Sequence, residues 1–203
     1  MRAYKFIEPQ YLAGALSGRL LLRPLHAYAS LENGLADDLD GAVRLEWPGR
    51  RVVTSGSREA MIAQRIGFSL GPGVHATFDG VSGTRLVQPG LAFCTCATPA
   101  NVELRKQGRT AIIEILDVDE LGRRLAAAHP DRLGAPTARS VRYENRVFRA
   151  DQPILPEPNA FIKDKAFQSE KEIRIVWPTI SGEIPEQFTT AAPGIAPLLR
   201  HYA

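Results

Sequence analysis

Hydrophobic residues recur along the chain in short stretches of the kind that form β-strands. Residues 110–116 carry an almost unbroken hydrophobic run, and residues 173–177 form a β-branched and aromatic run that a proline ends. Two further stretches, residues 43–47 and 51–54, flank the turn signal at Pro48 and Gly49 and predict a hairpin. These patterns predict a protein built mainly from antiparallel strands.

Helical patterns are short and lie between the predicted strands. We expect helices over residues 8–16, 59–66 and about 118–128. The last two follow side chains that commonly cap helices, Ser57 in one case and Asp117 or Asp119 in the other. The chain lacks the glycine-rich phosphate-binding motifs and the regular strand–helix alternation of doubly wound folds. The sequence therefore predicts an α+β fold, in which short peripheral helices surround a mainly antiparallel core of one or two sheets.

The length of the chain fits one folding unit. A chain of 203 residues is long enough for one substantial hydrophobic core, and it contains no internal repeat. We expect a single domain over residues 1–203. Residues 179–203 contain several prolines and no clear hydrophobic periodicity. We therefore expect these residues to form a mostly irregular tail packed on the body.

The composition is that of an ordinary globular protein, with 44% hydrophobic and 23% charged residues. The formal net charge of +3 is too small to indicate nucleic-acid binding by itself, although it permits an anionic ligand. The hydrophobic runs are too short for a membrane-spanning helix, and the amino terminus lacks the pattern of a signal peptide. We therefore expect a cytoplasmic protein without a membrane partner. The sequence gives no indication of its oligomeric state.

Two cysteines, Cys94 and Cys96, lie one residue apart on a predicted strand. Alternation directs their side chains to opposite faces, which strains a disulfide between them and favours free thiols. A structural zinc site needs about four ligands, and the chain has neither a second cysteine pair nor a histidine pair to complete one. The sequence therefore predicts no metal.

Two carboxylates, Glu170 and Glu172, stand at the start of the predicted strand that ends at residue 177. With strand periodicity, both would share a face with Arg174, and Lys163 lies shortly before them. Neighbouring carboxylates repel each other unless positive charge lies against them. That charge is supplied by a cationic substrate, by a charge that develops during a reaction, or by the adjacent basic side chains. A solvent-facing edge strand of mixed charge is the simplest alternative.

The order of several motifs resembles a known family. These motifs are Tyr4-Lys5-Phe6 at the amino terminus, the predicted strand 18–22, Phe93-Cys94-Thr95-Cys96, Lys163, and the late run from Glu170 to Arg174. The arrangement resembles a widespread bacterial and phage family of uncharacterised domains with a late Glu-x-Glu-x-Arg strand. Its layout is also similar to that of the ADP-ribosyltransferase superfamily.

The resemblance implies a set of roles in the cleavage of NAD. Glu172 matches the catalytic glutamate of the superfamily, and Glu170 matches the residue two positions before it. Thr95 matches the hydroxyl residue of the middle strand, although this chain has Cys-Thr-Cys where the superfamily has Ser-Thr-Ser. Tyr4 matches the first-strand residue that holds NAD. Two basic residues, Lys163 and Arg174, would either contact the pyrophosphate or neutralise the glutamates.

The predicted function is accordingly ADP-ribosyl transfer from NAD or NAD glycohydrolysis, with Glu172 as the central residue. The acceptor is a protein, a nucleic acid, a small molecule or water, and the sequence does not choose among them. The alternative is a non-catalytic module that retains the fold and binds nucleic acid, or that acts as an immunity or assembly partner. In the nucleic-acid reading, Trp47 or Tyr143 would stack on bases between dispersed arginines. The enzyme hypothesis requires Tyr4, Thr95 and the two glutamates to converge on one cleft.

Overall fold

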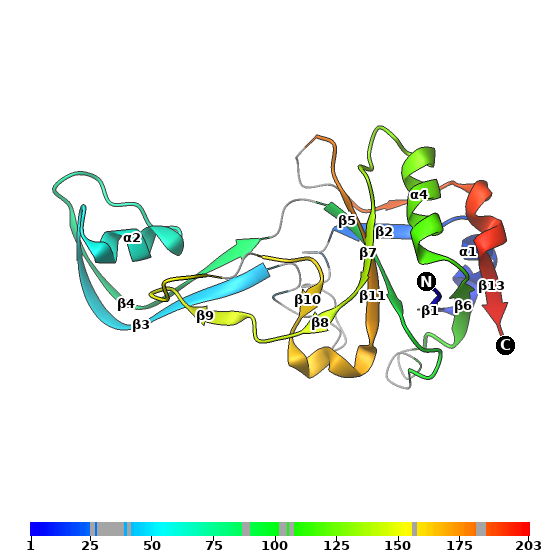
Figure 1. The fold of residues 1–203 in the computed structure, drawn as a ribbon, viewed down its shortest axis with the longest axis horizontal. Helices are drawn as coiled ribbons and strands as arrows, with labels where there is room; N and C mark the ends of the chain where they lie inside the picture. The colour runs from blue at the N-terminus through cyan, green and yellow to red at the C-terminus, as the bar shows by residue number, and fades with distance from the viewer. Residues whose placement is uncertain are drawn as a thin grey trace.

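The computed structural model describes residues 1–24, 27, 39, 42–86, 90–101, 105, 108–155, 158–181 and 186–203. A main body is built on one large sheet, and an arm of two long strands projects from it (Figure 1). Most strand pairings are antiparallel, and the helices are short, so the predicted α+β class is confirmed. No described helix has the length and apolar character needed to cross a membrane.

The main sheet is organised around the central strand β5 (Gly90–Cys96). One edge of β5 pairs along its whole length with β11 (Glu172–Pro178), which in turn pairs with β7 (Thr137–Ser140). The other edge is shared by β1 (Ala3–Ile7) and β2 (Leu21–Pro24). Outside these two lie three more strands: β6 (Ala111–Ile115) and β13 (Leu199–Tyr202) beyond β1, and β12 (Phe188–Thr189) beyond β2.

The shared edge of β5 makes a fork in the sheet. Tyr4 of β1 pairs with Cys96, whereas Arg23 of β2 pairs with Ala92. At about 3.3 Å per residue, these two attachment points are separated by about 13 Å along β5. Between these points, none of the described strands pairs with residues 93–95 on this side. The chain crosses from β1 to β2 through the 3-10 helix η1 (Pro9–Tyr11) and helix α1 (Leu12–Leu16).

Helix α4 (Val118–Ala128) covers the main hydrophobic core on one face of the sheet. Asp117 caps this helix, as predicted, by accepting hydrogen bonds from two backbone N–H groups of the first turn. Leu121 and Leu125 belong to the buried core beneath the helix, together with Trp177 of β11. The Trp177 indole donates a hydrogen bond of 3.1 Å to the carbonyl of Gly122. A Cβ atom added to Gly122 would lie only 3.1 Å from the Ile175 side chain. Glycine at this position therefore allows close packing of helix on sheet.

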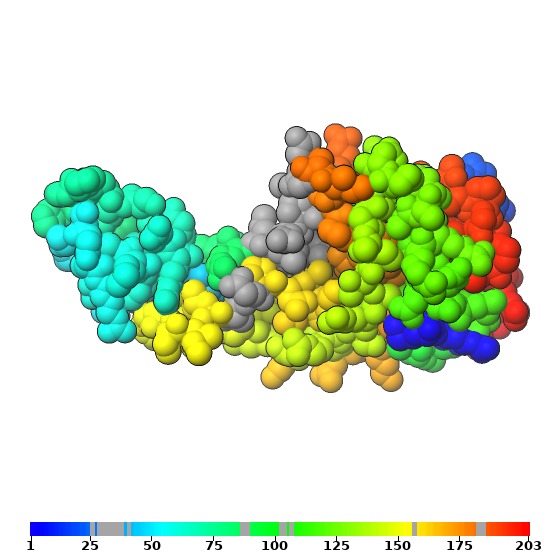
Figure 2. Space-filling view, turned by 45° about the horizontal axis from the view of Figure 1, so that its top comes forward, coloured from blue at the N-terminus to red at the C-terminus, as the bar shows by residue number. Residues whose placement is uncertain are grey.

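The arm contains β3 (Ala42–Thr54), β4 (His75–Leu86) and α2 (Arg58–Arg65), with β9 (Val147–Arg149) alongside β3. It protrudes clearly from the body (Figure 2). A separate hydrophobic cluster lies inside it. The predicted hairpin is wrong, because residues 43–47 and 51–54 form one strand that pairs with β4. Pro48 and Gly49 do not form a turn between two strands but lie at a register shift in the β3–β4 pairing, between Trp47 and Arg50.

The remaining elements are short. Strands β8 (Arg142–Tyr143) and β10 (Ile162–Lys163) pair in parallel, and the 3-10 helix η3 (Lys165–Glu170) follows them. Within residues 179–203, the predicted mostly irregular tail, the structure has β12, the 3-10 helix η4 (Pro193–Leu198) and the edge strand β13. Three of the four β13 side chains are exposed, so no hydrophobic alternation marks this strand in the sequence.

Candidate functional site

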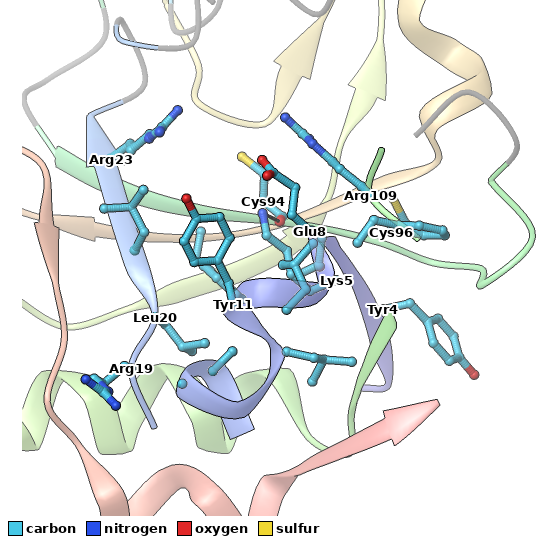
Figure 3. Close-up of a pocket in the computed structure, with 18 of the residues that line it drawn as sticks. Tyr4, Lys5, Glu8, Tyr11, Arg19, Leu20, Arg23, Cys94, Cys96 and Arg109 are labelled. Carbon is cyan, nitrogen blue, oxygen red and sulfur yellow. Dashed lines mark hydrogen bonds between the residues drawn. The ribbon is translucent and has the colours of Figure 1, made fainter. Parts of the chain in front are cut away.

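A pocket of about 770 Å³ occupies the fork of the main sheet (Figure 3). This volume falls in the range of about 300–1,000 Å³ typical of small-molecule sites. Its walls come from β1, the η1–α1 connection, β2, β5, the segment before β6, and the region from β10 to β11. Five of the six residues predicted from the sequence border the pocket: Tyr4, Thr95, Lys163, Glu170 and Glu172. These residues lie on or next to β1, β5 and β11, which are therefore neighbours around one cavity.

Four charged side chains, Lys163, Glu170, Glu172 and Arg174, form what we call the charged cluster. Glu172 is 4% exposed, and both of its carboxylate oxygens face Arg174, with Nε–Oε1 and Nη2–Oε2 distances of 2.6 and 3.2 Å. The Lys163 ammonium lies 3.3 Å from Glu172 Oε2 and 2.7 Å from Glu170 Oε2. One lysine therefore bridges the two carboxylates.

Arg174 lies behind the carboxylates with no exposed surface. Its remaining terminal nitrogen, Nη1, donates a 2.7 Å hydrogen bond to the carbonyl of Ala160. Of the two roles that the resemblance allows for Arg174, this geometry matches neutralisation of Glu172 and leaves no surface for a pyrophosphate. Glu172 and Arg174 share a face of β11, as strand periodicity predicts.

Glu170 reaches the charged cluster by a different route from the one that the sequence suggests. It ends η3, and the next residue, Lys171, has a left-handed backbone with a φ of 46°. This conformation interrupts the strand period, so Glu170 does not belong to the row of Glu172 and Arg174 on β11. Its side chain nevertheless meets the same Lys163 ammonium, which brings the two carboxylates into one site.

The surroundings separate the acidities of the two carboxyl groups. Burial by itself would raise the pKa of Glu172, but the charges of Arg174 and Lys163 and the hydrogen bond from Arg174 outweigh burial and lower this pKa to about 2. Burial also raises the pKa of Glu170, and here the charges of Lys163 and Arg174 and the hydrogen bond from Lys163 do not offset it. Glu172 is therefore a fixed anion near neutral pH, whereas Glu170 accepts a proton more readily. Pairs of carboxyl groups with separated acidities are typical of acid–base sites.

Two of the predicted NAD-binding residues point elsewhere. The Tyr4 ring is turned away from the pocket in Figure 3 and meets Tyr202 edge-on, with ring centroids 5.3 Å apart. Thr95 is 3% exposed, and its hydroxyl donates a 2.8 Å hydrogen bond to the carbonyl of Ile173 on β11. Both residues border the cavity, but neither presents its polar group freely to a ligand.

Lys5 is a pocket residue that the sequence analysis missed. Its ammonium crosses the fork and donates a 2.7 Å hydrogen bond to the carbonyl of Cys94, and it lies 4.9 Å from the centre of the Phe93 ring. The lysine thereby satisfies a carbonyl on the part of β5 that β1 leaves uncovered. Burial lowers the pKa of Lys5. Strand periodicity places Lys5 on the same face as Ala3 and Ile7, which both face the main core. A lysine at such a core-facing position was the signal in the sequence.

Among the described residues that line the pocket, positive charge outweighs negative charge. Five of them are basic, namely Lys5, Arg19, Arg23, Arg109 and Lys163, and three are acidic, namely Glu8, Glu170 and Glu172. The exposed ring of Tyr11 stands at the opening with Glu8 beside it (Figure 3). Several of these residues lie on connections or strand ends, for which the local sequence pattern gives no functional signal.

The cysteines of β5 border the same cavity. Cys96 is buried, and its burial raises the thiol pKa to about 12. It is therefore a neutral thiol at physiological pH rather than a nucleophilic thiolate. Cys94 is half-buried and hydrogen-bonds Glu172, which adds to the stabilisation of that carboxylate.

Comparisons with known proteins add no relative. A scan against protein-family models, a search of curated proteins and a search of solved structures each found no match for this chain.

Proposed function

We propose that the protein binds NAD in the pocket of the forked sheet and cleaves its nicotinamide–ribose bond, with Glu172 as the catalytic carboxylate. The observation that carries this proposal is the pair of glutamates that border one cavity with separated acidities. Glu172 is an anion held rigidly by Arg174, whereas burial raises the pKa of Glu170. This difference in acidity suits one carboxylate that stabilises positive charge and a second that accepts a proton.

Cleavage of NAD develops positive charge at the reacting sugar. The bond between nicotinamide and ribose C1′ breaks, its electron pair leaves with nicotinamide, and the ribose becomes oxocarbenium-like. A preorganised carboxylate in a water-poor site stabilises this charge where it forms, and loss of one such group typically costs about 10²–10³-fold in rate. Glu172 meets the requirement because Arg174 fixes both of its oxygens.

The second step transfers the ribosyl group to an acceptor. A hydroxyl of water or of another acceptor attacks C1′, and its proton passes to the Glu170 carboxylate. General-base catalysis of this kind contributes about 10²–10⁴-fold. Glu170 is suited to the role because its side chain is more exposed than that of Glu172, at 15% against 5%, and because its pKa is raised.

The lining of the pocket favours an anionic substrate with aromatic rings. The five basic residues exceed the three acidic ones, and two of those acidic residues belong to the charged cluster. The exposed ring of Tyr11 offers aromatic surface at the opening. The diphosphate and an aromatic ring of NAD match these features.

A non-catalytic role is the second candidate, and one observation favours it. Both glutamates already have an ion-pair partner, Lys163, within 3.3 Å, an arrangement that also suits a structural brace around a ligand-binding pocket. The nucleic-acid version of this alternative has less support. Trp47 is 2% exposed in the core of the arm, and the Tyr143 hydroxyl accepts a hydrogen bond from the Glu172 backbone.

Release of nicotinamide and ADP-ribose from NAD, separated by chromatography, tests the proposal. We expect release by the native protein and a fall of about 10²–10³-fold for Glu172→Gln. The matched control is Glu144→Gln, which removes the same charge from an exposed position 3.5 Å from Arg142 and should keep the native rate. Because Glu172→Gln leaves Arg174 without its counter-ion, circular dichroism must show folded protein at the assay temperature. Absence of nicotinamide release by folded native protein, with protein and nucleic-acid acceptors supplied, would support the non-catalytic alternative.

A further inference from the structure

The opening of the pocket carries charges that the charged cluster does not use. We call this region the pocket mouth and define it by Tyr11, Arg23 and Arg109. In Figure 3 the two arginine side chains lie on either side of Tyr11 and Glu8 and extend toward each other. Arg23 enters from β2, beside the point where that strand joins Ala92, whereas Arg109 enters from the segment before β6.

Arg23 has an unsatisfied hydrogen-bond donor. Its Nε atom is buried and has no hydrogen-bond partner among the residues that the structure describes. A buried donor without a partner is costly, and most such groups in native proteins are satisfied. A ligand that accepts this hydrogen bond would therefore be bound more tightly than one that fills only the cavity.

Arg109 is half-buried and forms no ion pair with any described residue. Its charge contributes to lowering the pKa of Lys5, so the two cations lie close enough to repel each other. An anion placed at the mouth would relieve this repulsion. Glu8, the acidic residue that the structure describes beside Tyr11, accepts a hydrogen bond of 3.1 Å from Gln10 and supplies one negative charge against the described cations.

We propose that the pocket mouth binds the diphosphate of a nucleotide between Arg23 and Arg109, with an aromatic ring of the nucleotide against Tyr11. Arginine presents a planar fork of donors that fits phosphate oxygens, and two such forks from opposite sides match a diphosphate better than a single phosphate. Tyr11 is 59% exposed, which leaves its ring available for stacking. The ligand class is a nucleoside diphosphate.

This inference rests on the proposed function for the orientation of the ligand. With the diphosphate at the mouth, the ribose that reacts lies deeper, toward the charged cluster. The positions of Arg23 and Arg109 then determine which substrates reach Glu172: dinucleotides with a diphosphate are retained, whereas nucleosides are not.

Binding of ADP and of adenosine, measured by isothermal titration calorimetry, tests the inference. For native protein we expect adenosine to bind at least tenfold more weakly than ADP. We expect Arg23→Gln and Arg109→Gln each to weaken ADP binding by about 10- to 100-fold while leaving adenosine binding within about twofold, since hydrogen bonds to charged groups account for such ratios. The control is Arg123→Gln, which removes an exposed arginine of α4 and should leave ADP binding unchanged.

Three results would overturn the inference: equal binding of ADP and adenosine, native ADP affinity in both pocket variants, or no ADP binding by folded native protein at millimolar concentration. The use of two arginines keeps the test valid if one variant fails to fold. The reaction is judged separately. Arginine-dependent ADP binding without NAD cleavage supports the inference and contradicts the proposed reaction, whereas NAD cleavage with native KM in both variants supports the reaction and overturns the inference.

Discussion

The charged cluster and the pocket mouth differ in how their charged groups are paired. In the charged cluster, each glutamate has a cationic nitrogen within 3.3 Å, and Arg174 has no exposed surface. At the pocket mouth, Arg23 has a donor without a described partner, and Arg109 has no described ion pair. The first arrangement is complete without a ligand, whereas the second is not.

The difference shows how one cavity combines rigidity with recognition. Mutually satisfied buried charges fix the position of a carboxylate, because moving it would leave a charge uncompensated in a medium of low dielectric constant. Unsatisfied cations near the surface favour an anion from solution. We therefore expect substitutions in the charged cluster to change stability or the rate of reaction, and substitutions at the pocket mouth to change affinity.

The largest effect should follow from breaking the cluster at Arg174. Replacement by Met leaves the Glu172 carboxylate buried without its main partner, which typically destabilises a protein by about 3–5 kcal/mol. Urea denaturation measures the loss. The matched substitution Arg142→Met removes an exposed arginine 3.5 Å from Glu144 and should cost less than about 1 kcal/mol. Equal losses for the two variants would show that the cluster does not brace the fold.

A smaller effect is expected from Glu170→Gln, which should lower NAD turnover by about 10²-fold without weakening ADP binding. The pH dependence gives a second criterion. Because burial raises the pKa of Glu170 above its usual 4.5, the base is lost as pH falls through that raised value, and native activity should fall on an acidic limb above pH 4.5. The limb should be absent in the variant. A native profile that stays flat down to pH 4.5 would exclude Glu170 as the base.

The smallest effect should come from Thr95→Val. Its hydroxyl donates to Ile173 across two strands, so the substitution should cost about 1 kcal/mol of stability. We expect ADP affinity and the KM for NAD to change by less than about twofold. A KM that rises tenfold would instead place the hydroxyl against the substrate, as the resemblance implies, and would extend the binding region beyond the pocket mouth.

Local patterns in the sequence were sufficient for part of this picture. Strands β6 and β11 follow from continuous hydrophobic runs, and α4 follows from its cap at Asp117. Two-residue periodicity places Glu172 and Arg174 on one face of β11, where they form their ion pair. Each of these inferences depends on residues that are close in the chain.

The parts that were missed depend on distant pairings or on single backbone conformations. The fork exists because β1 and β2 share one edge of β5, and hydrophobic periodicity does not specify strand partners. The same limit applies to the arm, where β3 continues through Pro48 and Gly49 and pairs with β4. The left-handed Lys171 places Glu170 off the strand. Without the fork there was no reason to select Arg23 or Arg109 among the many arginines.

The central claim is that Glu172 stabilises the reacting ribose of NAD and contributes little to NAD affinity. The most direct test measures the affinity and the rate of bond cleavage separately in one variant. NAD affinity by calorimetry and the single-turnover rate of nicotinamide release should be measured for native protein and for Glu172→Gln at a temperature where both are folded. We predict dissociation constants within about threefold and a rate lower by about 10²–10³-fold in the variant. A variant that binds NAD and releases nicotinamide at the native rate would contradict the account and leave the charged cluster as a purely structural feature.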